Sequence, residues 1–409
     1  MANLETYKYN IQAIQLLLPD SSIINLDTIR VSDMELTRDY DNYFFPIFKF
    51  TIALSIDDYY TIIENKTDIK MRVRIQYRNS NKDYSKLLFN EIFSVYIDNN
   101  TPDLNKELRQ RTNDVVSKST NGNLTDFGSS LELYLFREDY LNYNNTIINK
   151  IIKQGSMLDV ITYLFYNSGI RKNVLLENFD NKNIYNEILL PPMKLIQSLA
   201  YLENQFGFYN TYSTFFFDID YIYLMSKKSG CNVWKKGDIK TVVFHIFSGA
   251  TEYNFVNGSY YENNQYHINI TKDSFIIESN SVSRNAIEGT NRLMINSIDG
   301  TVDDINQSSI QRGKGNYKVI VNKYDNKFLA NAEKNDNEDS NILSIQLVDY
   351  DILNITPNKE YKVVFDDSAL SKQYGGIYRL TSNISIFAKE GTEYTLKSSL
   401  ELRKRVKEN

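Results

Sequence analysis

NEILLPPMKLIQSLAYLENQFGFYNTYSTFFFDIDYIYLMSK, residues 186–227, is the stretch that decides the predicted fold. Pro191 and Pro192 suit the first turn of a helix, where a missing backbone N–H costs nothing. Apolar residues then recur at steps of three or four and give this helix one apolar face: Ile196, Leu199, Leu202 and Phe206. Gly207 follows at the position where a left-handed cap would end the helix.

The residues after Gly207 predict two strands. Residues 208–225 are rich in aromatic and β-branched side chains, and turn-forming residues interrupt them at Asn210 and from Asp218 to Asp220. Such runs are typical of a hairpin that returns against the preceding helix.

The same α/β pattern extends back to residue 127. Leu131, Leu133 and Leu135 suggest a strand, and Ser156 with Asp159 resembles a capping box at the start of a helix. The apolar face predicted for that helix is Leu158, Ile161, Leu164 and Phe165, and its predicted end is Gly169. A short strand is expected at residues 174–176. We therefore expect a mixed α/β domain over residues 127–235.

Residues 1–98 predict a β-barrel-like domain. Apolar and polar residues alternate from Phe48 to Ile56 and from Ile69 to Tyr77, as in half-buried strands. Further strand candidates lie at residues 7–18, 24–36 and 88–97. Several short strands at this spacing are typical of a small barrel or sandwich.

One face of the predicted strand at residues 69–77 and just beyond is basic. It carries Lys70, Arg72, Arg74 and Arg78, with Gln76 among them. Such a face could meet DNA or an acidic neighbour, but a solvated outer face is the simpler interpretation. We expect it to point outward, toward an acidic neighbour.

The rest of the chain divides into a connector, a second β domain and a tail. Residues 99–126 lack apolar periodicity and predict an extended connector. Residues 236–390 predict a second β-barrel-like domain with long loops, and residues 391–409 a basic tail that is either a short docking helix or frayed. The predicted fold is thus α+β, mostly β, with two β-barrel-like domains flanking a mixed α/β domain.

Composition excludes several classes of protein. The chain has 409 residues, 42% of them hydrophobic and 24% charged, as in ordinary globular proteins, and its net charge of −5 offers no overall footprint for nucleic acid. Cys231 is the single cysteine, so no intramolecular disulfide or cysteine-based zinc cluster is possible. No signal peptide or membrane-spanning run is expected.

Signatures of catalysis or metal binding are weak. His245 and His267 both lie on strand-like segments, where ordinary β positions explain them better than a metal site that needs more ligands. Asp218 and Asp220 are the most suggestive carboxylates, since a glycosidase needs two of them around a sugar. Their position in a predicted turn, where Asp bonds its own backbone, favours a structural role. Two adjacent acidic pairs, Glu138–Asp139 and Asp303–Asp304, are interpreted as solvated loop charges. We therefore predict no enzyme, no catalytic or metal site, and no cofactor.

Two segments carry a resemblance to a known family. SMLDVITYLFYNSGI (residues 156–170) and LENQFGFYNTYSTFFFDIDYIYL (residues 202–224) are similar to the baseplate hub, or tail hub, proteins of contractile-tailed bacteriophages. The resemblance implies a structural virion protein that is assembled in the host cytoplasm. It implies a homotrimer in which two barrel-like domains per subunit form a pseudo-sixfold ring. Such a ring joins the tail tube to the central spike, contacts other baseplate subunits, and lets genomic DNA pass through its lumen on ejection without specific binding.

Two other functions remain open from the residues alone. A β-rich tail protein could bind a carbohydrate or receptor through tyrosine clusters such as Tyr59–Tyr60 or Tyr260–Tyr261. A wall-degrading tail hydrolase would act through Asp218 or Asp220. The hub interpretation is preferred, because neither alternative has a recognisable site geometry.

Overall fold

The structure is a computed structural model. It describes residues 4–26, 31–65, 67–80, 85–97, 129–171, 173–227, 233–234, 237–247, 258–271, 274–279, 290–296, 302–304, 316–322, 328, 331–332, 338–390 and 393–405. Strands dominate these residues, with short helices between them, so the predicted α+β, mostly β class is confirmed. Among the described residues no helix is both long enough and apolar enough to cross a membrane.

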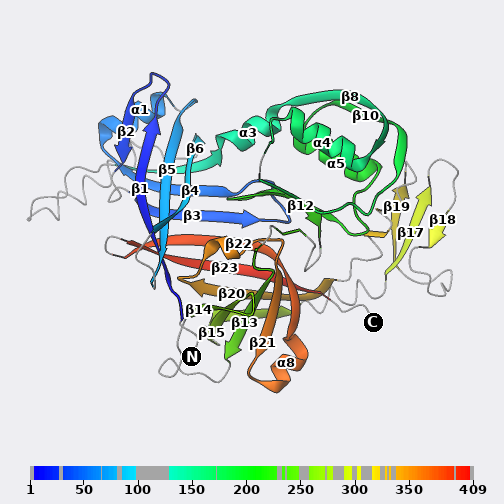
Figure 1. The fold of residues 1–409 in the computed structure, drawn as a ribbon. Coiled ribbons are helices and arrows are strands. Elements are labelled where there is room, and N and C mark those ends of the chain that lie inside the picture. The colour runs from blue at the N-terminus through cyan, green and yellow to red at the C-terminus, as the bar shows by residue number, and fades with distance from the viewer. Residues whose placement is uncertain are drawn as a thin grey trace, which may run out of the picture.

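Eight strands pair in a closed ring and form a barrel (Figure 1). In pairing order they are β22 (Gly376–Glu390), β3 (Val31–Asp39), β4 (Ile47–Leu54), β7 (Ser129–Arg137), β6 (Ser85–Ile97), β5 (Lys70–Asn79), β1 (Tyr7–Leu17) and β23 (Glu393–Arg405). β2 (Ile23–Leu26) pairs with β1 beside the ring. All neighbours in the ring are antiparallel.

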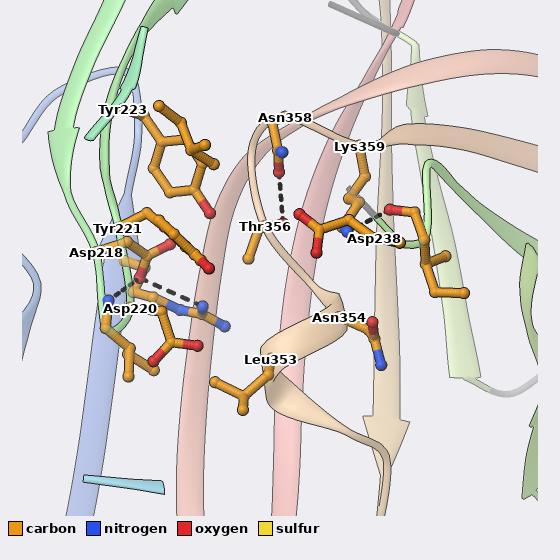
Figure 2. Close-up of a pocket in the computed structure, with 15 residues that line it drawn as sticks. Asp218, Asp220, Tyr221, Tyr223, Asp238, Leu353, Asn354, Thr356, Asn358 and Lys359 are labelled. Atoms are coloured by element: carbon orange, nitrogen blue, oxygen red, sulfur yellow. Dashed lines mark hydrogen bonds and ion pairs between the residues drawn. The ribbon is translucent and has the colours of Figure 1, made fainter. Parts of the chain in front are cut away.

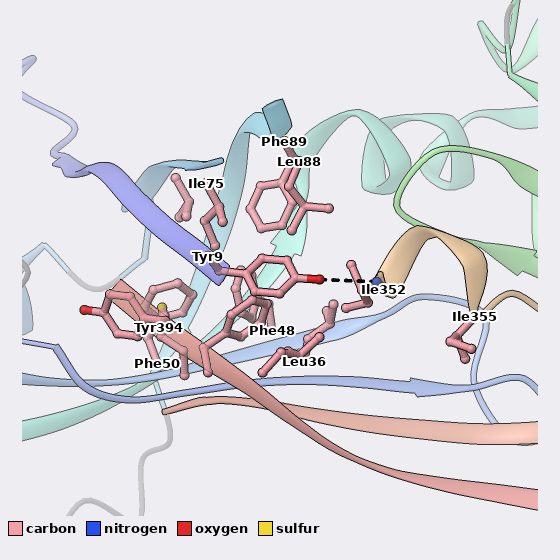
Figure 3. Packing of buried hydrophobic residues seen from close by; sticks show 14 of the residues in the cluster. Tyr9, Leu36, Phe48, Phe50, Ile75, Leu88, Phe89, Ile352, Ile355 and Tyr394 are labelled. Atoms are coloured by element: carbon pink, nitrogen blue, oxygen red, sulfur yellow. Dashed lines mark hydrogen bonds between the residues drawn. The ribbon is translucent and has the colours of Figure 1, made fainter. Parts of the chain in front are cut away.

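Side chains fill the barrel. Tyr9, Phe48 and Phe50 are buried and belong to one large apolar cluster (Figure 3). The Tyr9 hydroxyl donates to the backbone oxygen of Tyr350 at 2.8 Å and accepts from the backbone N–H of Ile352 at 3.2 Å. Ile352 begins the short 3₁₀ helix η3 (Ile352–Asn354). The barrel is therefore a packed core, as expected for eight strands.

A second set of eight strands shares two members with the barrel. In pairing order it runs β14 (Gly258–Glu262), β15 (Gln265–Thr271), β13 (Thr241–Phe247), β21 (Glu360–Phe365), β22, β23, β20 (Glu338–Val348) and β16 (Phe275–Ser279). On β22, Tyr378 pairs with Tyr361 of β21, while Ser382 pairs with Asp39 of β3. The β22–β23 hairpin, orange to red in Figure 1, thus runs through both sets.

Peripheral elements complete this half. They are helix α8 (Ser368–Tyr374) and a small sheet made of β17 (Thr290–Asn296), β18 (Val302–Asp304) and β19 (Asn316–Asn322).

The prediction of a basic tail at residues 391–409 is wrong for its described part. Residues 393–405 form β23, a central strand of both sets. Leu396, Leu400 and Leu402 are fully buried, and residues such as Lys397 lie on the exposed side of the strand. Lys397 thus alternates with buried leucines, as on a strand with period two. The predicted connector at residues 99–126 lies outside the described residues, and the division into domains stays a prediction.

The α/β part contains two layers around its own apolar cluster. A two-stranded ribbon of β8 (Ile147–Ser156) and β10 (Ile184–Lys194) arches over helices α4 (Met157–Asn167) and α5 (Leu195–Gln205) in Figure 1. Helix α3 (Glu138–Asn145) connects this part to the barrel, and β9 (Val174–Leu176), β11 (Ser213–Phe217) and β12 (Ile222–Ser226) form a three-stranded sheet.

Several local predictions for the α/β part are confirmed. Residues 213–226 form the predicted hairpin. Ser156 and Asp159 form the capping box, with the Asp159 carboxylate accepting from the Ser156 backbone N–H at 2.8 Å. Gly207 has φ +70° and donates to the backbone oxygen of Glu203 at 2.9 Å, as a left-handed cap requires.

Other local predictions are wrong. Pro191 and Pro192 lie in β10 at a shift of register, where neither pairs with β8, and the pairing resumes at Met193. The helix begins later, at Leu195. Leu158 is 51% exposed, because the buried face of α4 uses Met157 and Val160 together with the predicted residues.

The strand that was predicted from Phe48 to Ile56 ends at Leu54, and a helix follows it. Helix α1 (Ile56–Glu64) begins at Ile56, with the Ser55 side chain accepting from the backbone N–H of Asp58. The Ser-x-x-Asp spacing was the available signal for this start.

Candidate functional site

The turn between β11 and β12 gathers polar contacts from several elements. The Asp218 carboxylate accepts from the backbone N–H of Ile219 at 2.8 Å and from the Tyr40 hydroxyl at 3.1 Å. Its own backbone N–H donates to the oxygen of Tyr221 at 2.8 Å. The predicted structural role of Asp218 in a turn therefore agrees with its contacts, since the carboxylate bonds its own backbone.

Arg38 meets the same carboxylate from the barrel. It lies on β3, is 1% exposed, and its Nη1 is 3.5 Å from Asp218 Oδ1. The Nε and Nη2 atoms of Arg38 have no hydrogen-bond partner in the part of the chain that the structure describes. Burial lowers the pKa of Arg38, but the oxygens of Tyr40 and Asp218 outweigh it and the pKa lies above its ordinary value. The guanidinium is thus charged, buried and incompletely bonded.

Helix α3 and the last residue of β7 also donate hydrogen bonds to the turn. The Tyr140 hydroxyl donates to the backbone oxygen of Asp218 at 2.7 Å, and Arg137 donates to the backbone oxygen of Ile219 at 2.9 Å. Arg137 is itself held by Asp139 at 2.7 Å. The barrel, helix α3 and the hairpin are therefore joined through one acidic turn. This burial argues against a catalytic role for Asp218, because a sugar cannot reach its carboxylate.

A cavity of about 260 Å³ lies beside the turn (Figure 2). The turn forms one wall, and residues 353–359, which join η3 to β21, form the opposite wall with Asp238. Lys359 is buried and donates to the backbone oxygen of Ile239. Burial lowers the pKa of Lys359, and nearby Asp238 opposes that shift. The cavity thus has two cations and several carboxylates on its surface.

The structure brings the two histidines together. His245 on β13 and His267 on the parallel neighbour β15 place Nε2 and Nδ1 2.9 Å apart, and their rings stack. The Tyr260 ring stacks on His267 at 4.7 Å between centroids. Burial lowers the pKa of both histidines. Among the described residues no group of three or more His, Cys, Asp or Glu side chains could hold a metal ion, so the pair has no third ligand there.

The tyrosine pairs proposed for carbohydrate binding do not form flat platforms. Both lie on α1, where Tyr59 is buried and Tyr60 is exposed. Tyr260 and Tyr261 point to opposite faces of β14, because neighbours on a strand alternate. Tyr261 stacks on Tyr266 and accepts from Asn354 at 2.8 Å, so most of its surface is engaged within the chain.

The basic face of β5 is exposed, as expected, but half of its charges are already paired. Lys70 forms an ion pair with Glu138, and Arg78 forms a two-bond pair with Glu393 at 2.8 and 3.0 Å. Arg72 contacts only the Gln15 amide, at 3.5 Å. Within the described residues Arg72 and Arg74 have no acidic partner. The face is exposed on the single chain, and its direction toward an acidic neighbour stays a prediction.

The acidic pairs differ from their prediction as loop charges. Glu138 and Asp139 form the first turn of α3, where carboxylates favour the helix dipole. Asp303 and Asp304 belong to strand β18, and their side chains lie outside the described part of the chain. Cys231 also falls outside it.

Sequence reasoning missed the partners of Asp218. Along the chain, Arg38 lies 180 residues and Tyr40 lies 178 residues away from Asp218. A charged residue at an inward strand position was the available signal for a buried pair, and the period of β3 places Arg38 there.

Comparison with solved structures places the chain in a class. A tail protein from Neisseria meningitidis MC58 has the same fold, with a TM-score of 0.50, 10% identity and 96% of each chain covered. The 43 kDa tail protein of prophage MuSo2 from Shewanella oneidensis gives a TM-score of 0.48 at 10% identity, over 95% of this chain and 96% of that one. A Francisella PdpA–VgrG complex gives 0.49 at 9% identity, over 97% of this chain and 53% of the other. This chain thus shares its fold with the Neisseria tail protein.

The family is identified by a family model. The model described as Bacteriophage PBS1 gene 109 protein matches residues 2–405, and the chain belongs to that family. No curated protein matches the sequence. The phage family and the fold shared with a tail protein together confirm the resemblance to baseplate hub proteins.

Proposed function

We propose that this protein is the baseplate hub of a tailed phage and forms a homotrimeric ring between the tail tube and the central spike. One observation carries the proposal: a single chain has two eight-strand sets joined through the β22–β23 hairpin. Three copies would then present six eight-strand sets around one axis. A threefold assembly with two related units per subunit can match a sixfold tube on one side and a threefold spike on the other.

The shared hairpin supports rigid placement of the two units. Each half of β22 pairs with a different set, so the units cannot rotate about a flexible linker without breaking strand pairs. A ring with regular spacing needs a fixed angle between the two units of each subunit. With a variable angle, the subunits would not close into a ring.

The charge of the chain is compatible with a conduit for DNA. Its net charge of −5 gives no general attraction for a polyanion, so DNA would pass through the lumen without specific binding. The lumen would lie between subunits, since the barrel itself is filled by side chains. Tail tube protein, spike protein and other baseplate subunits are the proposed partners. The proposed location is the phage tail baseplate in the virion, after assembly in the host cytoplasm.

The contacts of Asp218 favour a structural rather than an enzymatic role. Its oxygens accept hydrogen bonds from Tyr40 and the adjacent backbone, and it is 1% exposed. We therefore propose no enzyme, and zymography on cell walls checks this directly. Lysis by wild type that is lost in Asp218→Asn would overturn it.

The test of the ring is the mass in solution. Light scattering over a concentration series should give about three times the 47.7 kDa of one chain, and electron microscopy of that species should show a ring with a central channel. A monomer at all concentrations, alone and with the cognate spike protein, would refute the trimeric hub.

A further inference from the structure

The β8–β10 ribbon exposes a group of aliphatic side chains on its outer face, the side turned away from α4 and α5 in Figure 1. On the inner face, Ile188 and Leu190 are fully buried in the apolar cluster of the α/β part. Four aliphatic side chains of the ribbon are instead between 51% and 71% exposed: Ile147, Ile151, Ile184 and Leu189. Single exposed aliphatic residues are ordinary, but a group of them marks an interaction surface.

Strand pairing joins these side chains into one surface. Ile151 lies opposite Leu189, and the exposed pair of Lys153 and Glu187 lies next to them on the same face. Cross-strand partners and residues two apart on a strand share a face, so their side chains are neighbours. The centre of the outer face is therefore aliphatic, with charged residues beside it.

The charge of the ribbon is opposite in sign to that of the whole chain. Its charged residues are the exposed Lys150, Lys153 and Lys194 and a single acid, Glu187. Lys153 and Glu187 are 3.7 Å apart and both mostly exposed, so their pairing neutralises little of either charge. The chain as a whole has a net charge of −5. A basic surface around aliphatic side chains complements a partner that is both anionic and apolar.

The residue types favour a lipid surface over a protein as that partner. The centres of protein–protein interfaces are enriched in Tyr, Trp and Arg and are depleted in Lys. Neither strand of the ribbon contains Trp or Arg, and its exposed centre is aliphatic with lysines around it. Aliphatic side chains enter the apolar boundary of a bilayer, while lysines extend their chains to reach anionic headgroups.

We propose that the outer face of the β8–β10 ribbon adsorbs to a membrane surface that contains anionic lipids. Ile151 and Leu189 enter the boundary between headgroups and acyl chains, and Lys153 and Lys194 contact the headgroups. The ribbon lies on the bilayer and does not cross it, because an open two-stranded sheet leaves backbone groups unpaired in lipid. The ribbon belongs to neither eight-strand set, so the proposed ring does not require this face. The proposal is therefore independent of the trimer.

Co-sedimentation of the full-length chain with lipid vesicles tests the proposal. One set of vesicles contains equal parts of phosphatidylcholine and phosphatidylglycerol, and the other contains phosphatidylcholine alone. The chain should bind the mixed vesicles about tenfold more tightly than the neutral ones, because the lysines lose their attraction without anionic lipid. High salt should weaken binding to the mixed vesicles, since ions screen exposed charges.

Variants of the ribbon separate the apolar from the charged contribution. Ile151→Ser combined with Leu189→Ser should weaken binding about tenfold or more, because two aliphatic side chains no longer leave water. Lys153→Gln should weaken binding to the mixed vesicles about fivefold. Glu187→Gln should strengthen it about fivefold, because a charge that repels the headgroups is removed. A residue that only supported the fold would not give tighter binding when substituted.

Matched controls lie on other parts of the surface. Arg72→Gln combined with Arg74→Gln removes two exposed charges from β5, and Ile276→Ser removes an exposed aliphatic side chain from β16. Neither change should alter binding, and thermal unfolding checks that every variant is folded. Three results would overturn the proposal: no binding to the mixed vesicles, equal binding by wild type and the Ile151 and Leu189 double variant, or loss of binding in the arginine variant.

Discussion

Leu400→Ala is the most direct test of the role of β23. Leu400 is fully buried and lies on the strand opposite Ile345 of β20 and Asn383 of β22. Truncating a buried leucine removes its transfer free energy and leaves a cavity, at a cost of about 2–5 kcal/mol. Against the roughly 5–15 kcal/mol that stabilises a typical domain, this is a large loss.

Lys397→Ala is the matched control, because Lys397 lies on the same strand with its side chain exposed. Its expected effect on the free energy of unfolding is within about 0.5 kcal/mol. Urea unfolding followed by circular dichroism should therefore lower the midpoint clearly for Leu400→Ala and hardly at all for the control, with little change in slope.

Truncation after Lys397 extends the test. It removes Leu400 and Leu402 together with the pairing of β23 to β20, so no folded protein is expected. If Leu400→Ala cost no more than the control, or if the truncated chain unfolded at the wild-type midpoint, β23 would not be part of the core and our reasoning would fail.

Three further predictions concern single sites. Asp218→Ala should lower the free energy of unfolding by about 3–5 kcal/mol, because Arg38 would stay buried without its carboxylate; a loss under about 1 kcal/mol in urea unfolding would contradict this. Burial raises the pKa of Asp351 to about 6, so its contribution to stability is present below about pH 4 and is lost as pH rises to about 6. Relative to wild type, Asp351→Asn should therefore gain about 3 kcal/mol across that window in urea unfolding, and parallel pH profiles would rule the linkage out. Gly207→Val should lose about 1–2 kcal/mol or more, because φ is +70°, while Gly207→Asn should lose less; equal melting temperatures for both variants and wild type would remove the cap.

Local signals in the sequence predicted local structure well. The Ser156–Asp159 spacing, Gly207 and the aromatic runs around Asp218 each specify a cap or a turn through neighbours within a few residues. Such features depend on short-range hydrogen bonds and backbone conformation, so one sequence is enough to place them.

Features that depend on distant partners were not predicted. Residues 393–405 alternate as a strand should, but their charges suggested a tail, and only the pairing of β23 with β22 and β20 decides the question. Pro191 and Pro192 are compatible both with the start of a helix and with a strand that contains a bulge. The pairing with β8 determines that they lie in a strand. The partners of Asp218, Arg38 and Tyr40, lie far from it in the sequence. Their contacts with Asp218 could therefore not be predicted from the sequence.

The β22–β23 hairpin also sets the order in which this chain can fold. Tyr9 of β1 pairs with Tyr394 of β23, so the barrel cannot close during synthesis until β23 has left the ribosome. Until then β1 and β3 have open edges that can pair with other chains. High sequence separation makes such closure slow, and exposed edges during that time favour aggregation. A chain interrupted before β22 would therefore complete neither of the two eight-strand sets.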